Sequence, residues 1–164
     1  MDRAQPLSSA NPAAGFLAGQ IAEHQRVSAR ASYVHRASEC IELVVRLDQD
    51  QDTPGAALGT LMARGLRVLA YSLHRDCSGE KLLLVAEDSW RARRILEQAG
   101  FLCRSDAVAL VESPRRVGVA AQLGARLTMA GIGVIHSYVS WSEGENVFLV
   151  FKTTDNRRAL RELG

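Results

Sequence analysis

The sequence is poor in the residues that mark several common protein classes. Only three of its 164 residues are cysteines, and Cys40, Cys77 and Cys103 form no Cys-x-x-Cys pair typical of zinc or redox sites. An odd number of widely spaced cysteines also argues against a disulfide framework. No apolar run approaches the roughly 20 residues that a membrane-spanning helix needs, and the first residues contain no apolar signal-peptide core. These absences predict a cytoplasmic protein that has no metal site and does not interact with a membrane.

Aromatic residues and net charge are also scarce. Phe, Trp and Tyr make up 5% of the chain, too few for the base-stacking strands of an RNA-recognition motif, and the formal net charge is only +2. The sequence contains no Gly-x-Ser-x-Gly elbow, no His-Glu-x-x-His and no P-loop lysine. We therefore expect no nucleic-acid partner, no cofactor and no enzymatic activity. The 47% of hydrophobic residues suffice for one ordinary core or two small ones.

Regular strand and helix patterns begin after residue 38. Residues 1–38 are rich in Ala, Ser and Pro, and we expect them to form a flexible N-terminal extension. The segment Ile41–Leu47 is β-branched and apolar, which predicts a strand. Thr53 and Pro54 are typical of a helix cap followed by a first helical residue. Further strands over 66–73, 81–86 and 101–104, with a helix from Ser89 to Gly100 between the last two, give the order βαββαβ.

The second half of the chain repeats this order. Strands are predicted over 107–111, 132–140 and 146–152, with helices over 119–130 and 156–163. Self-similarity at a spacing of about 65 residues indicates one domain repeated, with units at 39–105 and 106–164. The second unit lacks an obvious last strand, so either it is truncated or another segment fills that edge of its sheet. Because an open edge invites pairing, we expect a partner chain or the N-terminal extension there.

Three segments resemble the ACT family of regulatory domains. Residues 119–139 resemble the helix and second strand of an ACT unit, and residues 146–163 resemble its later strand, turn and helix. The segment Asp52-Thr-Pro-Gly55 is similar to the Asp-x-Pro-Gly signature that opens the family's first helix. The resemblance covers residues 40–164 and is strongest to stand-alone tandem ACT proteins. It implies an α+β fold of two ferredoxin-like βαββαβ units with antiparallel sheets, and a regulatory small ligand, usually an amino acid, at an interface between units.

The resemblance also implies which residues hold the ligand. In the family the ligand sits against the loop before the first helix, and a helix N-terminus with unpaired N–H groups suits a carboxylate. The second loop departs from the signature, because Gly118 has no Pro before it and no Asp two residues earlier still, where Arg115 and Arg116 stand. For these arginines a ligand carboxylate and plain solvation both remain open, as do a structural role and a ligand contact for His136. The matching positions, with three strand residues that could line the same cleft, are Asp52, Thr53, Gly55, Ala56, Tyr71, Arg116, Val117, Gly118, Val119, Ala120, His136 and Tyr138.

Two functions of different classes follow from these patterns. The first is an allosteric regulatory protein that binds an amino acid and works as a homodimer. The second is a ligand-free module that regulates a partner enzyme by docking, and the departing second loop favours it. A small-molecule enzyme of unfamiliar type has less support, since no acid–base pair stands out in the sequence.

Overall fold

A computed structural model describes residues 36–47, 53–77, 79–141 and 144–164 of the protein. The described residues all belong to one compact unit. Asp52 and the predicted extension up to residue 35 lie outside the described residues. No helix in the described part is long and apolar enough to cross a membrane. The elements, in chain order, are β1 (Arg36–Leu47), α2 (Pro54–Ala63), β2 (Val68–Asp76), β3 (Gly79–Ala86), α3 (Ser89–Gln98), β4 (Cys103–Pro114), α4 (Val119–Met129), β5 (Val134–Trp141), β6 (Asn146–Thr153) and α5 (Asn156–Leu163).

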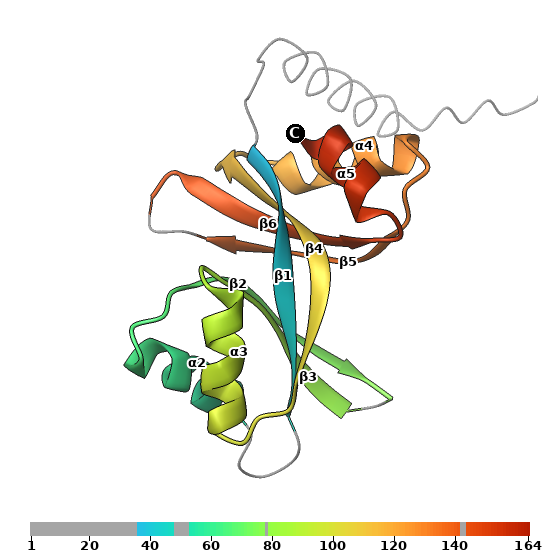
Figure 1. Ribbon diagram of the computed structural model, residues 1–164. Helices are drawn as coiled ribbons and strands as arrows, with labels where there is room; N and C mark the ends of the chain where they lie inside the picture. The colour runs from blue at the N-terminus through green and yellow to red at the C-terminus, as the bar shows by residue number, and fades with distance from the viewer. Residues whose placement is uncertain (1–35, 48–52, 78, 142–143) are drawn as a thin grey trace, which may run out of the picture. The chain divides into compact units, whose positions relative to one another are not determined.

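A six-stranded antiparallel sheet joins the two halves of the chain, in the order β2-β3-β1-β4-β6-β5. The two central strands are 12 residues long, and they lie side by side from the pair Arg36↔Glu112 to the pair Val45↔Cys103 (Figure 1). Strand β3 pairs with residues 42–47 of β1, and β6 pairs with residues 109–114 of β4. Each long strand therefore belongs to both halves. The predicted α+β class, with its βαββαβ order and antiparallel pairing, is confirmed.

The sheet edge that the second half lacks is filled by the start of β1. Residues 36–41 pair with residues 107–112 of β4 and so occupy the place of the missing last strand. The first three of these residues come from the predicted extension, and no partner chain is needed at this position. The separate strands predicted over 101–104 and 107–111 are one continuous strand, β4. The predicted boundary between residues 105 and 106 therefore falls inside a strand.

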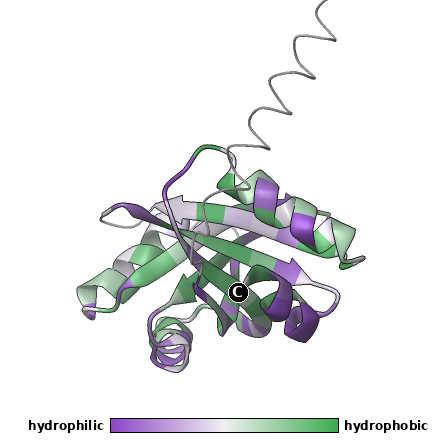
Figure 2. Ribbon diagram, turned by 90° about the horizontal axis from the view of Figure 1, so that it is seen from above, coloured by the Kyte–Doolittle hydropathy of each residue, from purple (hydrophilic) through white to green (hydrophobic). Residues whose placement is uncertain are grey.

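The two faces of the sheet have different coverings. Side chains alternate along a strand, and odd-numbered residues of β1 and β4 face the helices: Leu43 and Val45 pack in a core with α2 and α3, and Ala109 and Val111 in a core with α4 and α5. A third core lies on the opposite face, here called the inner face, and contains Val44, Ala70, Leu83, Val85, Val108, Leu110, Tyr138 and Val150. Figure 2 shows apolar residues, in green, along the strands between helices of mixed colour. The edge strands β2 and β5 contact each other, so the sheet curls around its inner face.

The three free cysteines differ in exposure, and we expect different reactivities. Cys77 is exposed, whereas Cys103 is half-buried. Burial, with a smaller contribution from Glu97, raises the pKa of Cys103 to about 11. Since the thiolate is the reactive form, alkylation of Cys103 at neutral pH should be at least about tenfold slower than that of Cys77, and it should accelerate as the pH rises. Timed alkylation followed by peptide mass spectrometry measures both rates, and equal rates at neutral pH would contradict the expectation.

Candidate functional site

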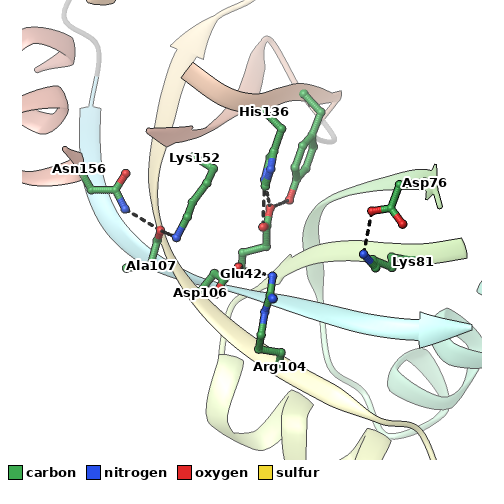
Figure 3. A network of polar contacts seen from close by, with 10 residues as sticks. Glu42, Asp76, Lys81, Arg104, Asp106, Ala107, His136, Lys152 and Asn156 are labelled. Carbon is green, nitrogen blue, oxygen red and sulfur yellow. Dashed lines mark hydrogen bonds and ion pairs between the residues drawn. The ribbon is translucent and has the colours of Figure 1, made fainter. Parts of the chain in front are cut away.

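A buried carboxylate lies at the centre of the inner face. Glu42 of β1 has no exposed surface. The hydroxyl of Tyr138 donates to its Oε1 at 2.8 Å, and Nε2 of His136 lies 3.1 and 3.0 Å from its two carboxylate oxygens. Figure 3 shows the side chain of His136 pointing towards Glu42. A carboxylate without solvent needs such donors, because an unpaired buried charge is very costly.

The curl of the sheet creates this cluster. Two strands, β4 and β6, separate β1 from β5 in the sheet, so Glu42 and His136 meet only because β5 folds over the inner face. His136 and Tyr138 are two residues apart and therefore point the same way. On the other edge strand, the ring of His74 has its centroid 5.7 Å from that of His136. The cluster thus connects edge strand β5 to central strand β1 through hydrogen bonds, and edge strand β2 contacts it through the ring of His74.

Tyr138 acts as a neutral donor in this cluster. Burial, followed by the charge and the hydrogen bond of Glu42, raises the pKa of Tyr138 far above its ordinary value. The phenol therefore keeps its proton, and all three side chains satisfy one another. A closed, fully paired network of this kind rigidifies a protein. It leaves no carboxylate oxygen without a donor for work on a substrate.

The described residues of the predicted site fall into four separate places. The loop that ends at Thr53 follows β1, whereas the loop with Arg116, Val117 and Gly118 follows β4. Because β1 and β4 are antiparallel, these loops lie at opposite ends of strands about 40 Å long at ~3.3 Å per residue. Tyr71 pairs with Leu84 and so lies on the helix face of edge strand β2, while His136 and Tyr138 lie on the inner face. The structure therefore does not gather these four groups into one cleft.

The starts of the helices differ in a way that bears on the two loops. The side chain of Thr53 accepts a hydrogen bond from the backbone N–H of Ala56 at 3.1 Å and so caps α2. The backbone N–H of Ala56 therefore already has an acceptor, as has that of Ala57, which donates to the carbonyl of Thr53 at 3.1 Å. Helix α4 begins with Gly118 at a φ of 82°, with no side-chain cap. Since Gly118 is left-handed and uncapped, the second loop offers a ligand carboxylate more than the first does.

An open cavity of about 760 Å³ lies at the other end of the inner face. Its lining includes Arg36 and Glu112 of the paired strands β1 and β4, Arg67 before β2, and Phe148 of β6. None of these residues was predicted from the sequence, nor was Glu42. For Glu42 a signal existed, since a single acidic residue stands in the apolar segment Ile41–Leu47. For the cavity none existed, because its walls come from five strands, β1, β2, β4, β5 and β6, that the curl brings together.

Similarity to solved structures shows the fold. No family model matches the sequence, and no curated protein does. The structure of protein BT0572 from Bacteroides thetaiotaomicron is 15% identical with a TM-score of 0.64, over 77% of this chain and 88% of that one. A structure of aspartokinase alpha and beta subunits is 18% identical with a TM-score of 0.54, over 79% and 93%. The regulatory subunit of aspartate kinase from Thermus thermophilus is 14% identical with a TM-score of 0.54, over 81% and 97%. At these identities the similarity extends to the ACT-like fold and no further.

Proposed function

We propose that the protein is a non-catalytic regulatory module, a stand-alone tandem ACT protein that binds an amino acid and works as a homodimer. The observation that carries this proposal is the pair of long strands shared by two ACT-like halves. A ligand that shifts one end of β4 also shifts the half beyond it, because the strand is continuous from Cys103 to Pro114. The fold of a regulatory subunit of aspartate kinase supports the same class of function.

The loop before α4 is the better of the two predicted ligand loops. Val117 is 96% exposed and Gly118 leaves the helix start open. The guanidinium of Arg116 contacts the side chain of Gln122 at 3.4 Å, which holds it beside the first turn of α4. An arginine and free backbone N–H groups together suit an α-carboxylate. The first turn, Val119 and Ala120, then supplies the backbone contacts.

A second copy of the chain is the proposed source of the rest of this site. The two sheet edges expose apolar side chains: Tyr71 and Leu73 on β2, and Ile135 and Val139 on β5. Exposed edge strands with such residues favour pairing between chains. A dimer through either edge brings side chains of a partner copy to a ligand loop, which one protomer does not do by itself.

The docking module is the second candidate, and one observation favours it. Helices α2 and α3 contact each other, and Met62 on α2 and Trp90 on α3 are 71% and 68% exposed. Large apolar side chains on adjacent helices are typical of a surface that binds another protein. Under this alternative a partner enzyme covers these helices and no amino acid is bound.

A thermal-shift screen with the twenty amino acids tests the proposal. At about 100 times its Kd a ligand stabilises the folded protein by about 2.7 kcal/mol, so one chemical group of amino acids should raise the melting temperature. In the Gly118→Val variant we expect that rise to disappear, because a β-branched residue does not tolerate the left-handed backbone at the ligand loop.

Gly131→Val is the matched control for this variant. Gly131 has a φ of 68° and open space around it, at the far end of α4. The control should suffer a similar loss of stability and keep the ligand-induced rise. If Gly118→Val also keeps the rise, the second loop is not the site. If no amino acid shifts the wild-type protein, the docking module replaces the ligand-binding proposal.

A further inference from the structure

The cavity of about 760 Å³ has an apolar floor and charged walls. The third core packs against the inner face of the sheet. The hydrogen bond between Tyr138 and Glu42 marks the end of this core. Beyond that end the strands β1, β4 and β6 continue, and their inner-facing residues Cys40, Leu110 and Phe148 line an open space. The floor of the cavity is thus a continuation of the third core.

Cations and anions of equal number surround this floor. Arg36 and Arg67 supply two guanidinium groups, and Glu112 and Glu145 supply two carboxylates. The side chains of Arg36 and Glu145 make no hydrogen bond or ion pair within the described part of the chain. Arg67 has one ion pair, from its Nε to Glu87 at 3.5 Å. Most of the donors of both guanidinium groups therefore remain available.

Glu112 is the best placed anion for a ligand. It is half-buried, and its Oε1 accepts one hydrogen bond from Nδ2 of Asn146 at 2.9 Å. It lies directly opposite Arg36 across the β1–β4 pair, at the ~5 Å separation of cross-strand Cβ atoms. These two side chains nevertheless form no ion pair with each other in the described part of the chain. One cation and one anion thus lie close together beside an apolar surface, and each can still pair with an opposite charge on a ligand.

We propose that this cavity is a second binding site, and that it takes a zwitterionic amino acid with an aromatic side chain. Its lining contains no residue of the loop before α4, although Arg115 of that loop stacks on Trp141 at the rim. The carboxylate pairs with Arg36 and Arg67, since guanidinium groups bind carboxylates through two parallel hydrogen bonds. The ammonium group pairs with Glu112. The aromatic ring lies on Phe148 and Leu110, in the offset or edge-on contacts that aromatic pairs favour. A neutral zwitterion balances both signs of charge, whereas a polyanion or a polycation would meet repulsion from one of them.

Three matched probes test the chemistry of the site: L-phenylalanine, 3-phenylpropionate, which lacks the ammonium group, and 2-phenylethylamine, which lacks the carboxylate. The chain has two tryptophans, so a Trp90→Phe variant leaves Trp141, on the rim of the cavity, as the fluorescent reporter. We expect L-phenylalanine to bind at least about tenfold tighter than either probe, as the loss of one charge-assisted contact implies.

Variants assign the two charges. In Glu112→Gln the preference for L-phenylalanine over 3-phenylpropionate should vanish. In Arg36→Gln its preference over 2-phenylethylamine should fall, and in the double variant Arg36→Gln/Arg67→Gln it should vanish. Arg104→Gln, which removes an ion pair with Asp106 outside the cavity, should change neither preference. Equal affinity for the three probes, no binding of L-phenylalanine, or preferences that survive both substitutions would overturn the inference. Gly118→Val should leave this binding intact, so that failure at the loop and failure at the cavity are told apart.

Discussion

Replacing Glu42 by alanine is expected to lower the free energy of unfolding by about 3 to 5 kcal/mol, the range for breaking a buried polar pair. The substitution leaves the hydroxyl of Tyr138 and the imidazole of His136 without their acceptor, in a place with almost no water. It also opens a hole where a fully buried side chain stood. Urea unfolding followed by circular dichroism measures the loss.

Two comparison variants separate the hydrogen bonds from the strand itself. Glu39→Ala removes an exposed carboxylate from the same strand and should change the stability by less than about 0.5 kcal/mol. Tyr138→Phe should cost about 1 to 3 kcal/mol as the lost donor. In the double variant with Glu42→Ala the two losses should not add, because both remove one hydrogen bond. Additive losses would mean that the two groups act independently of each other.

The second large effect concerns how the two halves unfold. Because β1 and β4 each run through both halves, neither half can lose its strands alone. We expect one cooperative transition, and we expect Leu96→Ala in the first helix-side core or Leu127→Ala in the second to shift it by about 2 to 5 kcal/mol. Each leucine is fully buried, so each substitution leaves a cavity.

The two tryptophans report the halves separately. Trp90 belongs to α3 of the first half and Trp141 to β5 of the second. In single-tryptophan variants, both probes should give the same urea midpoint, and Leu127→Ala should lower both midpoints equally. A native signal from Trp90 at a urea concentration where Trp141 reports unfolding would mean that the halves are independent domains. It would then support the predicted units 39–105 and 106–164.

The helices and strands could be predicted from local sequence signals. That the two halves share the strands β1 and β4 could not be predicted. Thr53 before Pro54 and the glycines after each helix are short-range signals, and the structure has helices and turns at these places. Residues 105 and 106 are Ser and Asp, which are typical of a turn, yet they lie within β4. Strand pairing with residues 42 and 43 of β1 keeps them extended. Such tertiary pairing overrides local preference and leaves no trace in the pattern of one strand.

The same limit applied to the candidate sites. Helix starts can be found from the sequence, so the loops at Thr53 and Gly118 were predicted, but not that they lie at opposite ends of antiparallel strands. The alternation along β5 correctly put His136 and Tyr138 on one face. Their acceptor, Glu42, is more than ninety residues away in the chain, and the curl of the sheet, a property of all six strands, brings it there.

The start of β1 supplies the last strand of the second half, as β4 supplies the last strand of the first half. The two halves are thus linked to each other in both directions. Helix α3 leads through residues 99–102 into β4, and the end of α5 lies at the matching position, where a Cβ on Gly164 would be 3.9 Å from that of Ala37. The two halves of the chain are therefore equivalent in topology. The first half begins in β1 and ends in β4, and the second begins in β4 and is completed by β1. The packing itself therefore does not distinguish a first half from a second half.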